Sequence, residues 1–358
     1  MAKSKKAETG KKDFPSELRF ALISGDWVVI ATGRAQRPET FKREKRIIKT
    51  VPKKDCFFCN IETQLPPLLI AAKGTIKNYA YNDEDRQNIK IPKDWAIVVI
   101  PNKYPAFVMK DGLNIRKRGL HQLMNAYGAA EVVVTRDHEQ QIAQFNLKQI
   151  KELLDVYQQR YVDLMKEPKI NYISIFHNHG VEAGASVSHP HSQIIATPVL
   201  DPRIKRSLLG AKDYYQHHGD CAYCLMNKWD KKNKERIVFE NKEFLVVCPF
   251  ASSSAFQMSI TPKKHLPYFE RITDEQKKYL AEAFQAALKK LYNGLEDPPY
   301  NFFLHTAPCD GRNHDYYHWH WVIVPKTATV AGFELCTGIE ISTIEPEKAA
   351  EYLRKQKI

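Results

Sequence analysis

The chain repeats one order of motifs, and this duplication restricts the folds that it can adopt. The first half contains CFFC, the strand-like run WAIVVIP, a histidine, a long amphipathic segment and SHPHSQIIAT. The second half follows the same order with CAYC, FLVVCPF, a histidine, another amphipathic segment and YHWHWVIVP. A strand-rich unit crossed by one long helix therefore occurs twice, and we predict an α+β fold with two similar halves.

The two amphipathic segments predict helices over residues 147–165 and 274–292. The expected N-caps are Asn146 and Thr273, each followed three residues later by a glutamine, which is the pattern of a capping box. The glycine at position 294 is expected to end the second helix.

Composition is that of an ordinary globular protein, with 43% hydrophobic and 27% charged residues among 358. Lysines crowd the N-terminus, so we expect a disordered basic tail over 1–13. An N-terminal catalytic domain is expected over 14–205 and a C-terminal domain over 206–358, with a linker near 200–215. No run approaches eighteen apolar residues and no apolar region follows the first lysines, which predicts a soluble, cytoplasmic protein without a membrane partner.

Each half supplies two cysteines and two histidines at matching places, with the histidines 51 residues apart in the first half and 53 in the second. Two thiolates and two imidazoles form the tetrahedral set that Zn²⁺ favours, and four protein ligands leave no position for a catalytic water. A redox C-x-x-C would not need the histidines, and a zinc finger would place them about a dozen residues after the cysteines. The predicted ligands of two structural zinc sites are Cys56, Cys59, His138 and His189 in the first half, and Cys221, Cys224, His265 and His318 in the second.

The second histidines of the two H-x-H pairs, His191 and His320, are left without a metal. FHNHGVEAGAS precedes the first pair, and its Gly184 and Ser186 can bring backbone N–H groups and a hydroxyl to an anion. Gln193 follows on the same strand face as His191, whereas an apolar residue follows His320. An imidazole beside a phosphate cradle attacks phosphorus, and fixed donors stabilise the charge that develops. We therefore assign His191 as the nucleophile, with Ser186 and Gln193 as donors.

These motifs, with GRAQRP at 33–38 and NKYPAF at 102–107, resemble the galactose-1-phosphate uridylyltransferase branch of the histidine triad superfamily over about residues 19–345. The resemblance implies two histidine-triad-like halves, each an antiparallel sheet crossed by a long helix, in a homodimer whose chains complete each other's sites. It implies that His191 takes a nucleotidyl group from a nucleotide sugar and passes it to a second sugar 1-phosphate or to phosphate. In this family a glutamine at the place of Gln193 goes with transferases.

The resemblance also implies substrate contacts, with arginines on phosphate and a C-terminal segment, TATVAGFELCTGIEIS, on the hexose. The predicted substrate-binding residues are Arg34, Arg37, Asn102, Asn178, Gly184, Phe333 and Glu340. GASVSHPHSQ and the second C-x-x-C are closer to a plant-type ADP-glucose phosphorylase than to many uridylyltransferases. Lys103, Gly332 and Ile339 stand where the family usually has aspartate, lysine and tyrosine, which bears on the choice of base and sugar.

Three functions are compatible with these residues. The first is uridylyl transfer between hexose 1-phosphates through His191, and the second transfers AMP by the same mechanism, in phosphorolysis of ADP-glucose or of a dinucleoside polyphosphate. The third is a zinc-stabilised nucleic-acid-binding protein, suggested by the basic tail and by aromatic residues such as Tyr316, Tyr317, Trp319 and Trp321. Such aromatics more often form core than base-stacking platforms, and no RNP-like pattern accompanies them, so nucleic acid ranks last as a partner.

Overall fold

The computed structural model describes residues 16–31, 41 and 51–358, so the predicted tail lies outside the described residues. The strands are β1 (Glu17–Phe20), β2 (Trp27–Ile30), β3 (Leu69–Ala72), β4 (Thr75–Asn78), β5 (Trp95–Pro101), β6 (Arg116–Arg118), β7 (His121–Leu123), β8 (Ala129–Thr135), β9 (Tyr172–His179), β10 (His191–Thr197), β11 (Ile237–Glu240), β12 (Phe244–Val247), β13 (Met258–Pro262), β14 (Tyr300–His305), β15 (His320–Pro325) and β16 (Glu340–Ser342). The α-helices are α1 (Leu147–Leu164), α2 (Pro202–His218), α3 (Ala222–Asn233), α4 (Asp274–Leu295), α5 (Gly332–Thr337) and α6 (Pro346–Arg354).

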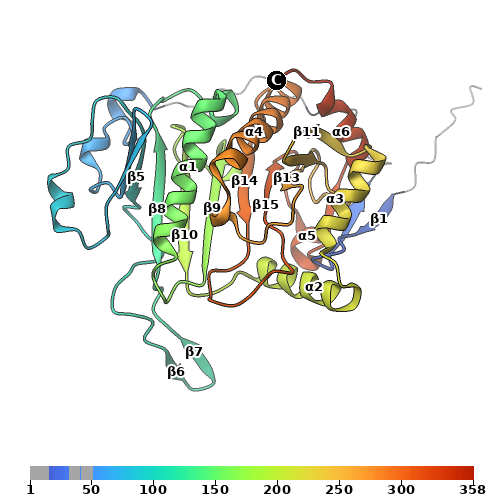
Figure 1. The fold of residues 1–358 in the computed structure, drawn as a ribbon, viewed down its shortest axis with the longest axis horizontal. Helices are drawn as coiled ribbons and strands as arrows, with labels where there is room; N and C mark the ends of the chain where they lie inside the picture. The colour runs from blue at the N-terminus through green and yellow to red at the C-terminus, as the bar shows by residue number, and fades with distance from the viewer. Residues whose placement is uncertain (1–15, 32–40, 42–50) are drawn as a thin grey trace, which may run out of the picture.

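One large antiparallel sheet runs through both halves of the molecule (Figure 1). Its eleven strands lie in the order β11-β12-β13-β15-β14-β9-β10-β8-β5-β3-β4. The halves meet where β14 pairs with β9, with Tyr300 opposite His179 and Phe303 opposite Phe176. The predicted α+β fold with two similar halves is confirmed, and the two half-sheets join edge to edge into a single sheet.

The long helices α1 and α4 lie side by side over the same face of this sheet (Figure 1). Each begins at a capping box, because Asn146 accepts a hydrogen bond from the Gln149 N–H at 2.9 Å and Thr273 accepts one from the Gln276 N–H at 3.2 Å. Their apolar faces bury into one core with the sheet, and each fully buried leucine contributes about 1.5–3 kcal/mol. The predicted helix starts are confirmed.

The predicted end of the second helix is wrong, because α4 continues through Gly294 to Leu295. Gly294 is buried against α6, and a Cβ there would lie 3.1 Å from Gln356 Cγ and 3.2 Å from Tyr352 Cε1. The Tyr352 hydroxyl donates to the Gly294 carbonyl at 2.7 Å. Glycine therefore serves the close approach of α6, and the helix stops at Glu296, whose φ is 56°.

The segment expected to be a linker near 200–215 is mostly helix α2 instead. Asp201 caps it by accepting hydrogen bonds from the N–H groups of Arg203 and Ile204 at 2.9 and 3.0 Å. Pro202 occupies the first helical position, where its missing N–H costs nothing. The Asp-Pro pair therefore starts a helix within the segment predicted to connect the two halves.

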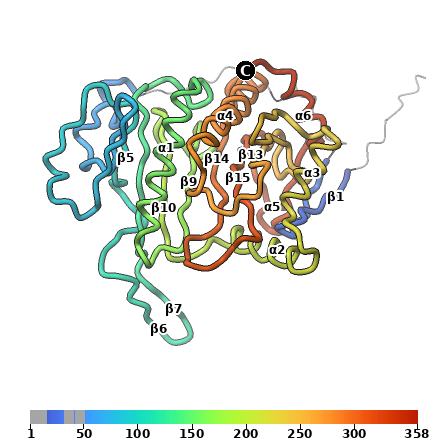
Figure 2. The backbone as a smooth tube through the Cα atoms, viewed as in Figure 1, coloured from blue at the N-terminus to red at the C-terminus, as the bar shows by residue number. Residues whose placement is uncertain are grey.

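The N-terminal strands β1 and β2 pack against the C-terminal part of the chain (Figure 2). They form a three-stranded sheet with β16, in which Val28 lies opposite Glu340 in parallel pairing. Arg19 reaches α6 and contacts Glu347 at 2.9 Å. The domain boundaries stay a prediction, and this strand pair, assigned to the first domain, lies beside the second.

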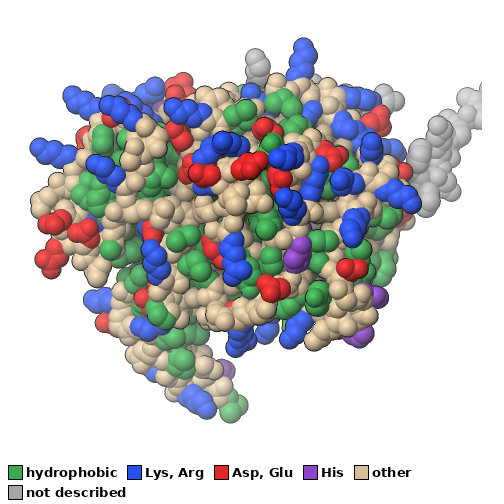
Figure 3. Space-filling view, in the orientation of Figure 1, with side chains coloured by type: hydrophobic (Ala, Val, Ile, Leu, Met, Phe, Trp, Pro, Cys, Tyr) green, Lys and Arg blue, Asp and Glu red, His purple; other side chains and the backbone are tan. Residues whose placement is uncertain are grey.

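Charged side chains are mixed over the visible surface. On the face shown in Figure 3, Lys and Arg side chains lie among acidic ones and do not gather into a single stripe. No helix within the described ranges is both long and apolar enough to cross a membrane.

Candidate functional site

Strand β10 presents its side chains alternately to the two faces of the sheet. Ser192 faces α1, because its Oγ lies 2.6 Å from the hydroxyl of Tyr157. His191 and Gln193, which flank Ser192, therefore lie on the opposite face, away from the long helices. The alternation brings the predicted nucleophile and its predicted donor to the same side, as expected.

The His191 ring is held in one tautomer by its own backbone. Its Nδ1 lies 2.9 Å from the carbonyl oxygen of His189, so Nδ1 carries the proton and donates it. No described residue hydrogen-bonds Nε2, which keeps its lone pair. Burial lowers the pKa of His191, and the hydrogen bond to the His189 carbonyl only partly opposes this. The side chain is a neutral imidazole with a free Nε2, which is the form that attacks an electrophile.

The loop between β9 and β10 returns across the predicted substrate contact Asn178. Gly184 ends a short 3₁₀ turn with φ 89°, a left-handed conformation that favours glycine. Asn301 of β14 donates to Asn178 Oδ1 and to the Ala183 carbonyl, both at 2.8 Å. Ser186 is exposed in the same loop. The sequence carries no local signal for the role of Asn301, because that role depends on the pairing of the two half-sheets.

Two more side chains that were missed hold the backbone around the nucleophile. The Thr135 hydroxyl donates to the Pro190 carbonyl at 3.0 Å. His177 Nδ1 donates to the His191 carbonyl at 2.8 Å, from the helix-covered face of the sheet. The alternation of FHNHG around Asn178 was the available signal, since it places His177 on the opposite face from Asn178.

The first predicted metal cluster is assembled as a compact donor set. The ligand atoms of Cys56, Cys59, His138 and His189 lie within 4.8 Å of one another. His189 donates from Nε2 to the Thr135 carbonyl at 2.6 Å, which turns Nδ1 towards the cluster, 3.6 Å from each Sγ. Two thiols and two imidazoles with such an outer hydrogen bond fit a tetrahedral metal site.

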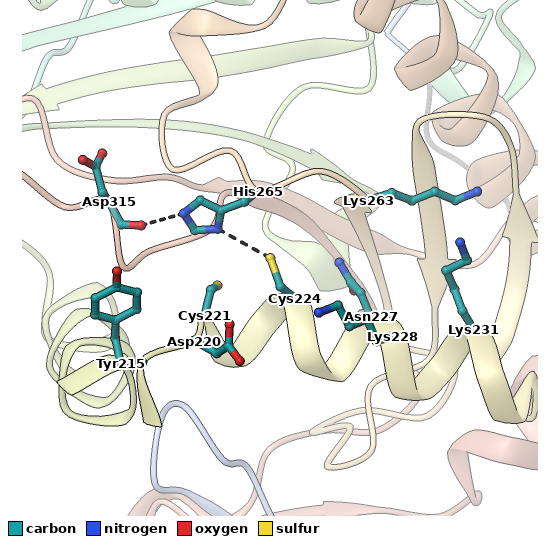
Figure 4. Close-up of a pocket in the computed structure, with 11 residues that line it drawn as sticks. Tyr215, Asp220, Cys221, Cys224, Asn227, Lys228, Lys231, Lys263, His265 and Asp315 are labelled. Carbon is teal, nitrogen blue, oxygen red and sulfur yellow. Dashed lines mark hydrogen bonds between the residues drawn. The ribbon is translucent and has the colours of Figure 1, made fainter. Parts of the chain in front are cut away.

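The second predicted cluster has the same donors, Cys221, Cys224, His265 and His318, within the same limit. His318 donates from Nε2 to the Pro262 carbonyl at 3.0 Å. His265, however, is exposed, and a cavity of about 550 Å³ opens beside it and the two cysteines (Figure 4). Both donor sets fit a metal, and the second is the more accessible.

His320 repeats part of the His191 arrangement in the second half. Its Nδ1 lies 3.1 Å from the His318 carbonyl oxygen, and burial lowers its pKa to about 4. Its neighbours differ, since the ring of His305 lies 5.2 Å away and Val322 stands where the first half has Gln193. The imidazole geometry recurs in the second half, and the set of polar donors does not.

The remaining predicted contacts are spread along the molecule. Asn102 donates its backbone N–H to Ala130 at 2.8 Å, and Ala130 pairs with Ile195 of β10. Asn102 therefore lies near the opposite end of β10 from His191, about 13 Å away by strand rise. Phe333 lies on α5, and Glu340 on β16 lies 3.9 Å from Arg203 of α2. The predicted phosphate contacts Arg34 and Arg37 lie outside the described residues.

The two halves of the chain match two domain models of one protein family. Residues 5–201 match the model described as galactose-1-phosphate uridyl transferase, N-terminal domain, and residues 207–357 match that of the C-terminal domain. The chain belongs to the galactose-1-phosphate uridyl transferase family. The predicted family is confirmed, and its uridylyltransferases are nucleotidyltransferases.

Relatives within the uridyl transferase family carry two different names. The chain is 31% identical over 345 residues to ADP-glucose phosphorylase of Arabidopsis thaliana, covering 95% of this chain and 92% of the relative. It is 30% identical over 354 residues to galactose-1-phosphate uridylyltransferase of Thermotoga maritima, covering 96% and 99%. The crystal structure of an ADP-glucose phosphorylase from Arabidopsis thaliana with bound ADP-glucose superposes with a TM-score of 0.76 at 29% identity, covering 96% of this chain and 100% of that one.

Proposed function

We propose that this protein is a hexose-1-phosphate nucleotidyltransferase in which His191 carries the nucleotidyl group. The observation that supports this most is the His191 ring, whose Nδ1 is bound to the His189 carbonyl and whose Nε2 has no hydrogen-bond partner among the described residues, on the face of the sheet away from α1 and α4. Nε2 attacks the phosphorus of the nucleotidyl group, and the bond to the leaving sugar 1-phosphate breaks with its electron pair. An oxygen of a second sugar 1-phosphate then attacks, the N–P bond breaks, and His191 recovers its neutral form.

The charge that builds on the phosphoryl oxygens needs fixed donors. Gln193 lies on the same face as His191, and Ser186 and the backbone at Gly184 belong to the loop that borders it. We assign Gln193 and Ser186 as donors to the phosphoryl group, with Arg34 and Arg37 as bidentate phosphate contacts. Asn178, fixed by Asn301, and Asn102 at the far end of β10 are the proposed nucleotide contacts.

We propose that both donor sets bind zinc with a structural role. The metal, when bound, links the C-x-x-C turn to the strand that carries the H-x-H pair, and four protein ligands leave no place for substrate. In the first half this holds His189, whose carbonyl orients the His191 ring. A bound zinc would therefore affect the His191 ring through the His189 backbone.

The predicted hexose contacts support a homodimer. Phe333 and Glu340 belong to α5 and β16, which lie beside α2 and β2 at the end of the molecule away from β10 (Figure 1). Residues in that position complete a sugar site around His191 when a second copy supplies them. We propose a cytoplasmic homodimer, with domains over 14–205 and 206–358.

UMP is the nucleotidyl group that we propose first, from a donor of the UDP-glucose type. AMP is the second candidate, because the 31% identical relative is named ADP-glucose phosphorylase and the superposed structure contains ADP-glucose. In that case phosphate is the acceptor. A nucleic-acid function has less support, because cations on the visible face are scattered among acids (Figure 3).

Covalent labelling decides between these candidates. The protein is incubated with UDP-glucose or ADP-glucose radiolabelled in the nucleotidyl phosphate, denatured and digested, and the labelled peptide is sequenced by mass spectrometry. We expect one donor to leave its nucleotidyl group on His191, and galactose 1-phosphate or phosphate to discharge it. Absence of label with both donors would reject the covalent mechanism for them, and label on another residue would reject the assignment of His191.

A further inference from the structure

The start of strand β10 is held differently from the rest of the sheet. Its pairing with β9 begins only at Ser192, opposite His177, and its pairing with β8 begins at His191, opposite Val134. Pro190, which comes just before, has no N–H to donate. The nucleophile is therefore the first residue of the strand, and the backbone ladder pairs it with β8 on one side but not with β9 on the other.

Side chains bind three successive carbonyl groups at this point. His191 Nδ1 donates to the His189 carbonyl at 2.9 Å, and Thr135 Oγ1 donates to the Pro190 carbonyl at 3.0 Å. His177 Nδ1 donates to the His191 carbonyl at 2.8 Å. Thr135, His177 and His191 are all buried. These hydrogen bonds replace the missing ladder over the H-P-H segment.

The second half lacks both of the added donors. Pro262 occupies the place of Thr135, since its carbonyl accepts from His318 as the Thr135 carbonyl accepts from His189. Leu304 occupies the place of His177, since it pairs with Trp321 as His177 pairs with Ser192. There the ladder reaches one residue further, with His305 opposite His320. The two donors thus accompany the half that carries the proposed nucleophile.

The burial of His177 would be costly without such a role. The ring is 1% exposed between the sheet and the helices, and burial lowers its pKa to about 3, so it is neutral. Nδ1 holds the proton for the His191 carbonyl, and Nε2 has no hydrogen-bond partner among the described residues. A leucine, as in the second half, would fill the site without an unsatisfied polar atom.

We propose that His177 and Thr135 are positioning residues for the nucleophile, which hold the His189–His191 backbone so that the His191 ring keeps its orientation. This inference rests on the proposed covalent chemistry of His191 only for its rate effect. The position of the ring can be measured without substrate. Neither residue touches the substrate, since His177 acts from the helix-covered face and Thr135 through the Pro190 carbonyl.

The test compares paired variants. His177→Leu removes the donor and supplies the second-half residue, and His177→Asn keeps an amide donor near the place of Nδ1. Thr135→Val and Thr135→Ser form the same pair, and carry the test if His177→Leu does not fold. Zinc content and melting temperature identify the folded variants.

Two readouts separate this inference from the proposed function. In protein labelled with ¹⁵N-histidine, the ring N–H signal of His191, assigned by its loss in His191→Asn, should exchange faster with water in His177→Leu and Thr135→Val, and not in His177→Asn or Thr135→Ser. The rate of covalent labelling should fall by about 10-fold to 100-fold in the first pair, at unchanged donor affinity, because small displacements of a reacting group have effects of this size. The exchange readout stands even if wild type accepts no label, a result that would reject the proposed function alone. An unchanged exchange rate in both donor-free variants, or equal impairment in the donor-keeping variants, would overturn the inference.

Discussion

The two halves of the molecule share the same arrangement of strands and one long helix, and they differ in the side chains packed between the sheet and the helix. Under strand β10, Tyr157, Ser192 and His177 form a buried polar group beneath the nucleophile, with Tyr157 and Ser192 oxygens 2.6 Å apart. Under β15, the matching positions hold Phe284, Trp321 and Leu304, which pack as an apolar cluster with Phe284 and Trp321 rings 5.1 Å apart. Directional hydrogen bonds between such polar groups favour one arrangement of side chains, whereas apolar contacts tolerate several.

A second position shows the same difference. Arg160 and Glu131 form a buried ion pair at 2.6 Å in the first half. Their counterparts, by helix position and by strand register, are Ala287 and Met258, both fully buried. The metal clusters and the helix caps recur in both halves, so the shared plan supports the fold. The buried polar side chains of the first half therefore extend from Ser192, beside His191, to Glu131, which lies opposite Ile194 further along β10.

Exchanging the two free histidines for asparagine gives the largest expected contrast. His191→Asn removes the nucleophile and should lower the rate of covalent labelling at least about 10⁴-fold, as loss of a nucleophile does in other enzymes. His320→Asn should leave the rate within about twofold, because Val322 stands where the first half has Gln193 and the set of polar donors does not recur around this ring. Single-turnover labelling with the accepted donor measures both. A large loss in His320→Asn would show that both halves take part in the chemistry.

The buried ion pair should contribute strongly to the stability of the first half. Glu131→Met introduces the second-half residue and leaves the buried Arg160 with one acidic partner among the described residues, Asp163 at 3.2 Å. We expect a loss of about 3–5 kcal/mol in the free energy of unfolding, because a buried charge without its partner is strongly destabilising. The double variant Glu131→Met/Arg160→Ala should recover most of it. Denaturant unfolding of the three proteins measures this, and an equally unstable double variant would contradict the assignment of the cost to the unpaired charge.

The two Cys-His clusters have the same kinds of ligand and should differ in how easily a chelator in solution reaches them. His265 is exposed beside a cavity that also reaches Cys221 and Cys224, whereas His138 is 6% exposed and His189 fully buried. Excess chelator should therefore remove one zinc equivalent per chain in a fast phase from the second cluster and one in a slow phase from the first. A colorimetric zinc indicator follows both phases.

Paired ligand variants assign the two phases. Cys221→Ser should abolish the fast phase and Cys56→Ser the slow one. If Cys56→Ser removed the fast phase instead, the first cluster would be the accessible one and the comparison of the halves would be reversed.

Local sequence patterns predict much of the fold and of the candidate site. The features that they do not predict depend on the pairing of strands that are far apart in the sequence. The capping boxes at Asn146 and Thr273 and the two Cys-His sets follow from spacing and repetition within each half, and the structure assembles them as predicted. The contact of Asn301 with Asn178 arises only because β14 pairs with β9. No local signal in the sequence specifies that edge, or the pairing of β2 with β16.

The role of Gly294 also depends on a long-range contact. Its sequence context is typical of a helix stop, and the approach of α6 from a distant part of the chain decides its role. The contact of His177 with the His191 carbonyl is hard to predict from the sequence for a related reason. It depends on the residue at which the pairing of β9 with β10 begins. Both depend on elements that the local pattern does not bring together.

The helix caps give the smallest expected difference and the sharpest control on the comparison. Asn146→Ala and Thr273→Ala each remove the side-chain acceptor of one capping box, and each should cost about 1 kcal/mol. The two values should be similar, because both caps belong to the shared plan and neither contacts the polar group beneath His191. Thermal unfolding measures the stability effect, and covalent labelling should stay at the wild-type rate in both. If Asn146→Ala slowed labelling while Thr273→Ala did not, the start of α1 would also help to position His191. The helix caps could then no longer be separated, as features common to both halves, from the buried polar side chains that are found only in the first half.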